Sequence, residues 1–241
     1  GNRDDSGLAP GRIRRCVEAS LERLGLERIP LYMTHQPDPD VPIEETLGAL
    51  DAEVARGTIG AYGACNVGLG GPESTVTELA GELDDAAPLR RYGWLQNEYN
   101  LFARADEDSV LPFCHRSGLG YTPFGPLAGG WLAGKYTAPG QYPTGSRMTL
   151  RPEPYRRLES DRTFAALADL AALAREYGVD QATLAFAWIF SEPAVTAVVV
   201  GPRRPAHLEP AVRALGMKLD ERASTELDAI SKHVTSGQPA S

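Results

Sequence analysis

Apolar residues recur along this chain with two spacings, one typical of helices and one of buried strands. Between Pro10 and Leu24 they fall every three or four positions, which predicts a helix with one buried face that ends at Gly25. A helix opened by Pro42 and ended by Gly57 carries Leu47, Leu50 and Val54 on one stripe. The same spacing predicts further helices at 72–83, 107–116, 164–173, 182–190, 208–215 and 220–230.

Short apolar runs predict five strands, at 29–35, 59–65, 91–96, 119–124 and 196–200. The last run is rich in β-branched residues, so we expect a fully buried strand there. Each strand is followed by a helix, which indicates parallel strands joined by right-handed crossovers in an α/β fold. No internal boundary appears, so residues 1–241 are predicted to form a single domain. Residues 136–159 are rich in Pro, Gly and Arg and predict a long loop over a site.

Polar residues stand where several of these strands end. His35 closes the first apolar run, Asn66 the second and Gln96 the third, and a glycine-rich stretch follows the fourth. The carboxyl ends of parallel strands are where α/β proteins carry their chemistry. Taken alone, His35 is equally compatible with a residue that only hydrogen-bonds at a strand end.

Charge and cysteine content narrow the class of protein. The formal net charge of −8, from 24 basic and 32 acidic residues, disfavours a nucleic-acid or anionic-membrane partner, although a small basic pocket for a phosphate ligand stays compatible with it. The three cysteines form no C-x-x-C pair, which indicates reduced thiols and a cytoplasmic protein. No apolar run approaches the ~20 residues of a membrane span, and no signal-peptide core is visible, so we expect no membrane partner.

Six segments, in order along the chain, resemble the aldo-keto reductase family of NADPH-dependent TIM (β/α)₈ barrels, and in particular its longer-loop branch. They cover Ser20–Gly25, Leu31–Asp38, Gly63–Asn66, Leu95–Leu101, Pro126–Tyr136 and Gly201–Arg204. Each is weak by itself, whereas the ordered set is specific.

The resemblance assigns roles at the strand ends. It makes His35 the catalytic histidine, which polarises the substrate carbonyl and orients it for hydride delivery from C4 of the nicotinamide. Asn66 and Gln96 would hydrogen-bond the nicotinamide carboxamide, next to Cys65, which stands where serine is usual. Phe124 would stack on the nicotinamide ring.

The remaining cofactor contacts implied by the resemblance follow the fourth strand. Backbone amides in the stretch Gly125, Pro126, Leu127, Ala128 and Gly129 would surround the pyrophosphate, where small residues allow close approach. Lys135, Arg147 and Arg203 would lie near the adenosine phosphates, with Gly201 in the same motif as Arg203. Each of these cations is also compatible with a solvated surface position.

The chain departs from the family pattern in its first part. The family barrel has eight β/α units, so five strands imply an incomplete barrel that lacks the first three strands and the catalytic aspartate, tyrosine and lysine. We expect upstream residues, a partner chain or a second copy of the chain to cover the exposed sheet edge. Gly125 also replaces a serine that would bind phosphate, which weakens the expected hold on NADPH.

Three functions follow from these observations. The first is an NADPH-dependent reductase of an aldehyde, ketone or keto-sugar. The second is a truncated homologue without activity that serves as an interaction or regulatory module. The third is a nucleotide-binding protein of altered chemistry that uses His35 alone. The presence of an aspartate, a tyrosine and a lysine upstream in the encoded protein would separate the first from the second.

Overall fold

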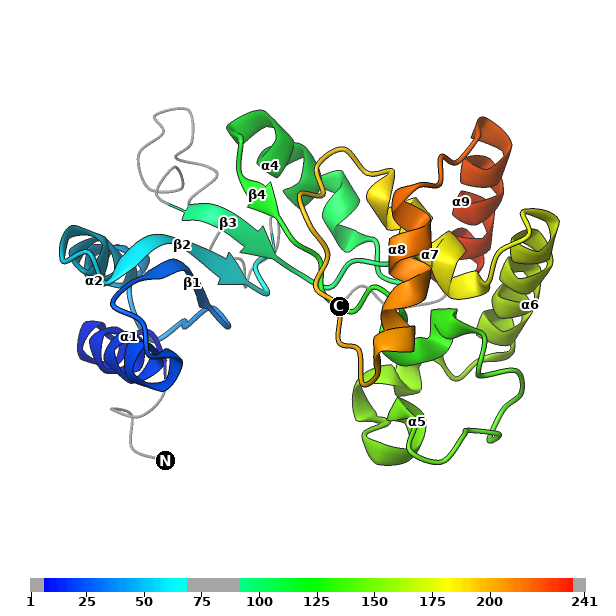
Figure 1. The fold of residues 1–241 in the computed structure, drawn as a ribbon, viewed down its shortest axis with the longest axis horizontal. Helices are drawn as coiled ribbons and strands as arrows, with labels where there is room; N and C mark the ends of the chain where they lie inside the picture. The colour runs from blue at the N-terminus through cyan, green and yellow to red at the C-terminus, as the bar shows by residue number, and fades with distance from the viewer. Residues whose placement is uncertain (1–6, 69–91, 236–241) are drawn as a thin grey trace. The chain divides into compact units, whose positions relative to one another are not determined.

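The computed structural model describes residues 7–68 and 92–235 of the chain (Figure 1). Its tertiary contacts divide the chain into two compact units. Unit 1 comprises residues 1–97 and 106–122, and unit 2 comprises residues 98–105 and 123–241. The helix predicted at 72–83 lies outside the described residues.

Unit 1 is built around a parallel sheet whose strands follow their order in the chain (Figure 1). These strands are β1 (Ile29–Thr34), β2 (Ile59–Cys65), β3 (Tyr92–Gln96) and β4 (Gly120–Tyr121). Helix α1 (Pro10–Leu24) precedes β1, and helix α2 (Ile43–Ala55) connects β1 to β2. The 3-10 turn η3 (Ala105–Asp108) and helix α4 (Val110–Ser117) connect β3 to β4. The first four predicted strands and the parallel pairing are thereby confirmed.

Helix α1 begins and ends where the sequence signals it, whereas the helix predicted at 107–116 begins only at Val110. Pro10 occupies the first turn of α1, and Gly25 ends the helix in the left-handed conformation at φ 65°. In α2, Leu47 and Leu50 are buried as predicted. The placement of Val54 on the buried stripe is wrong, because Val54 is 37% exposed and the neighbouring Glu53 is buried instead.

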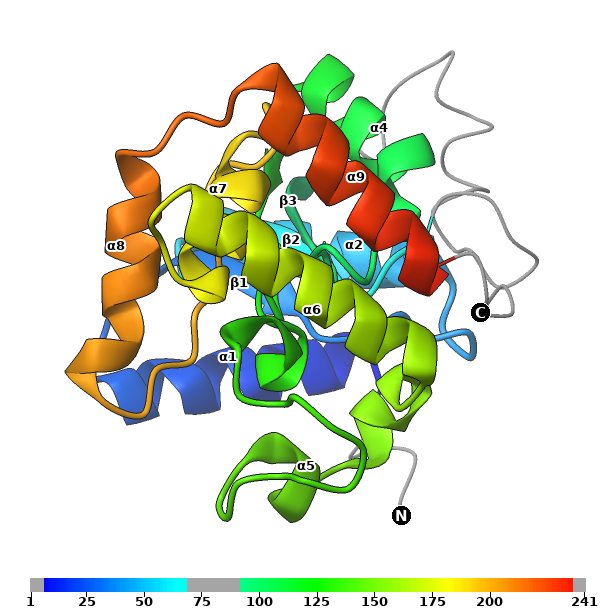
Figure 2. The same cartoon turned by 90° about the vertical axis from the view of Figure 1, so that its right-hand side faces the viewer.

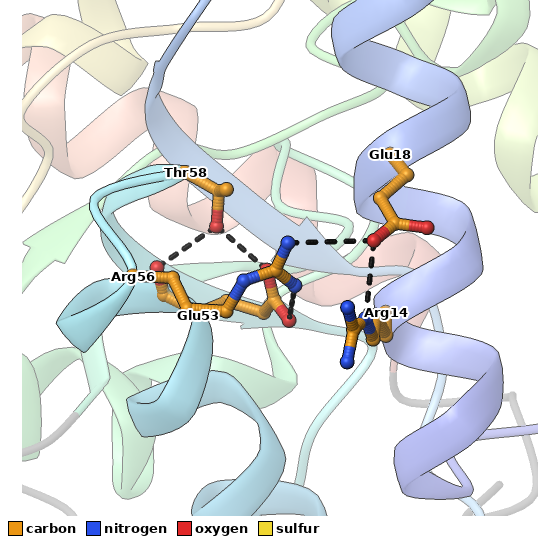
Figure 3. Close-up of polar contacts among 5 residues, drawn as sticks. All are labelled: Arg14, Glu18, Glu53, Arg56 and Thr58. Carbon is orange, nitrogen blue, oxygen red and sulfur yellow. Dashed lines mark hydrogen bonds and ion pairs between the residues drawn. The ribbon is translucent and has the colours of Figure 1, made fainter.

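Glu53 is tolerated in the interior because its carboxylate is fully partnered (Figure 3). Arg56 donates from Nη1 to both carboxylate oxygens at 2.9 and 3.2 Å, and Thr58 donates from Oγ1 at 2.6 Å. Arg56 also reaches Glu18 of α1 at 3.4 Å, and Glu18 accepts from Arg14 at 3.1 Å. The network ties the end of α2 to α1, since a buried carboxylate is stable only when it is paired and hydrogen-bonded.

Unit 2 is mainly helical in its described residues (Figure 2). Helix α6 packs on α9, and α7 packs on α8. Side-chain caps fix where helices α6 and α7 begin. Ser160 accepts from the Thr163 amide, and Asp180 accepts from the Thr183 amide. The elements are η4 (Ala128–Ala133), α5 (Arg147–Leu150), η5 (Glu153–Leu158), α6 (Asp161–Glu176), α7 (Gln181–Phe190), η6 (Pro205–Leu208), α8 (Glu209–Leu215) and α9 (Glu221–Thr235).

The fifth predicted strand, at 196–200, is wrong. The segment has no strand assignment, and Val199 and Val200 are 42% and 36% exposed. Its backbone is bonded to another segment of unit 2 by the Val199 amide, which donates to the Pro123 carbonyl at 2.9 Å. The β-branched run favours extended backbone, but the described residues form no strand ladder there.

None of the helices in residues 7–68 and 92–235 combines the length and the apolar character that a membrane-spanning helix needs.

Removal of the Arg56 guanidinium should destabilise the protein because the buried Glu53 carboxylate then loses its cationic partner. We expect Arg56→Ala to lower the free energy of unfolding by about 1–3 kcal/mol in urea titrations. The matched control is Arg14→Ala, which removes an exposed partner of the same network and should cost under about 0.5 kcal/mol. Equal effects of the two variants would contradict the role assigned to Glu53.

Candidate functional site

The carboxyl ends of β1, β2 and β3 bring three of the predicted site residues together within unit 1. The Asn66 amide donates to the Gln96 carbonyl at 3.0 Å, and Asn66 Nδ2 donates to the His35 carbonyl at 2.8 Å. The side chains of His35 and Asn66 are exposed, and Gln96 is half-buried. A set of polar groups that open to solvent at adjacent strand ends is suited to bind a small ligand.

Asn66 adopts an unusual backbone conformation, with φ at 57°. Among the described residues only Asn66 and Ala128 combine positive φ with a side chain, and both were predicted as cofactor contacts. Strained backbone of this kind concentrates at ligand sites. The Oδ1 atom of Asn66 accepts no hydrogen bond from the described residues. It is therefore available to accept one from an amide such as a carboxamide NH₂.

Gln96 is held on both sides of its amide group. Its Oε1 faces Cys65 Sγ at 3.7 Å, and its Nε2 donates to Thr122 Oγ1 at 3.3 Å. Trp94 Nε1 donates to the same hydroxyl at 3.0 Å. Burial raises the pKa of the Cys65 thiol, so the neutral thiol is the form that faces Gln96. Thr122 is a contributor that the sequence pattern did not reveal.

A buried polar cluster supports the residue after Asn66. Asn97 accepts from the Val67 amide at 3.0 Å and donates to the Val67 carbonyl at 2.6 Å. Asn97 Nδ2 also donates to Asp106 Oδ2 at 2.8 Å, and the Tyr121 hydroxyl donates to that oxygen at 2.5 Å. Burial raises the pKa of Asp106 against the opposing effect of these bonds. Burial, helped by Asp106, raises the pKa of Cys114 to about 12.

In unit 2 the predicted pyrophosphate loop, residues 125–129, follows Phe124, which is half-buried. The Phe124 carbonyl accepts from the Tyr99 amide at 3.3 Å, and the Gly125 carbonyl accepts from Nδ2 of the fully buried Asn100 at 3.0 Å. Gly125 has φ 66° and Gly129 has φ 66°, values that a glycine adopts without steric cost. The loop conformation therefore depends on its glycines and on Asn100.

The amides of this loop divide into two groups. Those of Ala128 and Gly130 donate inside the loop, to Gly125 at 2.8 Å and to Leu127 at 2.7 Å. Those of Leu127 and Gly129 donate to none of the described residues, and Pro126 has no amide hydrogen. Unpaired amides beside small residues match the chemistry that an anion such as a pyrophosphate requires.

The predicted cations lie in exposed positions of unit 2. Arg203 donates from Nη1 to the Gly145 carbonyl at 2.7 Å, which connects it with the turn that leads into Arg147. Lys135 places its ammonium 5.2 Å from the Tyr136 ring centroid and against the Cα of Gly130. Gly201 follows the segment that Val199 joins to Pro123. These positions fit both a phosphate pocket and solvated surface cations.

The described residues hold no group of three or more His, Cys, Asp or Glu placed to bind a metal ion.

A family model described as "Aldo/keto reductase family" matches residues 2–232. The chain belongs to the aldo/keto reductase family. Its fold is accordingly an α/β fold of TIM-barrel type with a parallel sheet.

Relatives of this chain differ in the activity or role that their names give. A probable voltage-gated potassium channel β subunit of Arabidopsis thaliana is 33% identical, over 88% of this chain and 64% of its own length. An NADH-specific methylglyoxal reductase of Escherichia coli K12 is 30% identical, over 90% and 64%. The glycerol dehydrogenase structure from Gluconobacter oxydans superposes with TM-score 0.78 at 26% identity, over 98% of this chain and 68% of that chain. The chain thus spans about two thirds of these proteins.

The raised pKa of Asp106 gives a pH dependence of defined sign. A folded-state pKa above the unfolded value means that the protonated carboxyl is the more stable buried form, so its contribution is present below pH 3.8 and is lost as pH rises through the folded pKa. Asp106→Asn stays neutral and keeps an oxygen that accepts from Tyr121. We expect the stability of this variant relative to the unchanged protein to increase with pH above about 4. Urea titrations at several pH values measure it, and a pH-independent difference would contradict the assignment.

Proposed function

We propose that this aldo/keto reductase reduces the carbonyl group of an aldehyde, ketone or keto-sugar with NADPH. The observation that carries the proposal is the strand-end group in unit 1, where left-handed Asn66 bonds to the backbones of both His35 and Gln96. Reductases among the relatives, such as the methylglyoxal reductase, support the same class of reaction.

The side chains at the strand ends would have different roles in the reaction. NADPH, when bound, supplies a hydride from C4 of its nicotinamide. His35 donates a hydrogen bond to the substrate carbonyl oxygen, which increases the positive charge on the carbonyl carbon and fixes its orientation. Asn66 Oδ1 accepts from the carboxamide, and Gln96 contacts the same group. Two amide contacts of this kind determine which face of a planar ring is presented.

Unit 2, taken by itself, offers groups suited to the pyrophosphate and adenosine phosphates of NADPH. Phe124 offers an aromatic face for stacking, and the free amides of Leu127 and Gly129 suit the pyrophosphate. Lys135, Arg147 and Arg203 would make the charge-assisted contacts to the adenosine phosphates. We propose NADPH rather than NADH because only NADPH carries a 2′-phosphate, which one of these cations can bind.

Reduction also needs a proton for the developing alkoxide. We propose that the family's tyrosine gives this proton, supplied by a further barrel segment or by a partner chain that covers the sheet edge. The same covering would pair the outer edge of β1, which has no strand beside it in residues 7–68 and 92–235. A second copy of the chain is one such partner. The substrate is a small carbonyl compound. The three free thiols are in keeping with a cytoplasmic location.

An inactive interaction module, the alternative function, is less well supported. A module that binds only partners has no need of an exposed histidine beside a strained asparagine. The nucleotide-binding protein of altered chemistry would share NADPH binding and lack carbonyl-dependent oxidation.

The role of His35 is tested in the protein as it is encoded. We expect that protein to quench NADPH fluorescence and to oxidise NADPH only when a carbonyl compound is present. His35→Ala keeps the backbone carbonyl that Asn66 needs, so its NADPH affinity should change less than about threefold while kcat/KM falls about a hundredfold or more. Retained kcat/KM in this variant would show that His35 is not catalytic.

The choice between the two nicotinamide cofactors is tested at Arg203. We expect Arg203→Ala to weaken NADPH about tenfold or more and to leave NADH affinity almost unchanged, because only NADPH carries the 2′-phosphate. Arg162→Ala, an exposed arginine of α6 outside the site, is the matched control and should alter neither. Dissociation constants from fluorescence titration measure the effect. An equal loss of affinity for both cofactors would show that Arg203 does not bind the 2′-phosphate.

A further inference from the structure

The buried cluster behind Asn66 consists of Asn97, Asp106 and Tyr121, called here the Asn97 cluster. Asn97 is 6% exposed, Asp106 8% and Tyr121 0%. We propose that Asn97 is the positioning residue for the nicotinamide carboxamide: it touches no ligand itself and fixes the backbone that presents Asn66. This inference rests on the proposed function.

The Asn97 side chain forms two hydrogen bonds to the backbone of Val67, one to its amide and one to its carbonyl. Val67 donates its amide hydrogen to Asn97 Oδ1 at 3.0 Å and accepts at its carbonyl from Asn97 Nδ2 at 2.6 Å. Val67 is only 6% exposed, so water does not replace these bonds at low cost. Two bonds to one peptide segment fix its rotation as well as its position.

The neighbouring carboxylate decides which way the Asn97 amide points. Asp106 Oδ2 accepts from Asn97 Nδ2 at 2.8 Å, so the donor end of the amide faces Asp106 and the Val67 carbonyl. Tyr121 donates to the same oxygen from β4 and anchors it. The acceptor end of Asn97 is thereby left for the Val67 amide. Asparagine suits this position because it combines a donor and an acceptor on a short side chain.

The consequence for the site follows from chain connectivity. Val67 comes directly after Asn66, so fixing Val67 restricts Asn66 to the left-handed φ of 57° at which its amide reaches the Gln96 carbonyl. Asn97 in turn comes directly after Gln96. The dipeptide Gln96-Asn97 therefore supplies one carboxamide contact by its first side chain and holds the other contact in place by its second.

A fragment comparison separates positioning from general damage. We expect Asn97→Ala to weaken NADPH binding about tenfold, which corresponds to about 1.4 kcal/mol. Binding of adenosine 2′,5′-bisphosphate, which lacks the nicotinamide, should not change. Because Asn97 acts through Asn66, the double variant Asn66→Ala/Asn97→Ala should bind NADPH no more weakly than Asn66→Ala alone. Titration calorimetry on the full chain gives all of these constants.

Each outcome decides the matter. An equal loss for NADPH and for the bisphosphate, no loss for either, or additive losses in the double variant would overturn the positioning role. Failure of the unchanged protein to bind either probe would refute the proposed function instead. If Asn97→Ala does not fold, hydrogen exchange on the unchanged protein still decides: the Val67 amide should exchange at least a hundredfold more slowly than an unprotected peptide, and exchange at the unprotected rate would overturn the clamp.

Discussion

Parallel pairing of β1, β2 and β3 is the constraint on which the candidate site depends. The registers that join Thr34 to Ala64 and Cys65 to Gln96 bring the three strands to their ends at one edge. Asn66, the residue after β2, continues the pairing because its amide donates a hydrogen bond to the Gln96 carbonyl. Polar side chains placed at these ends therefore meet without any contact designed for them individually. Side-chain bonds from Thr122 and Asn97 then refine where the amide groups point.

Unit 2 achieves close backbone approach by a different route. There the loop after Phe124 is shaped by left-handed residues and held from inside by Asn100, whose side chain also accepts from the Phe102 amide at 2.9 Å. A side chain at Gly129 would collide with the Tyr155 ring, so the loop and the 3-10 turn η5 pack only because that residue is a glycine. Glu98 and Arg157, paired at 2.9 Å, hold the same turn. Backbone amides, not side chains, are what this loop offers to an anion.

The sequence predicted most of this arrangement where the signal is periodic or local. Helix α1 matches its predicted bounds because a proline and a glycine mark its ends, and His35, Asn66 and Gln96 meet because strand order is simple. The prediction of a strand at 196–200 was wrong because β-branched residues indicate extended backbone but do not specify a neighbouring strand. Glu53 is buried and Val54 is exposed, the reverse of the prediction, because the ion pair with Arg56 stabilises a buried glutamate. Hydrophobic spacing alone does not reveal such a pair. Asn97 and Asp106 were missed for the same reason: isolated buried polar residues have no period, and only the polar run after β3 hinted at them.

We propose that His35, Asn66 and Gln96 together fix one face of the nicotinamide toward a carbonyl polarised by His35. The most direct test is the stereochemistry of hydride transfer, measured with NADPH deuterated separately at the 4R and 4S positions and the encoded protein as catalyst. We expect deuterium to reach the alcohol product from only one of the two deuterated cofactors. Transfer from both, or from neither, would contradict it.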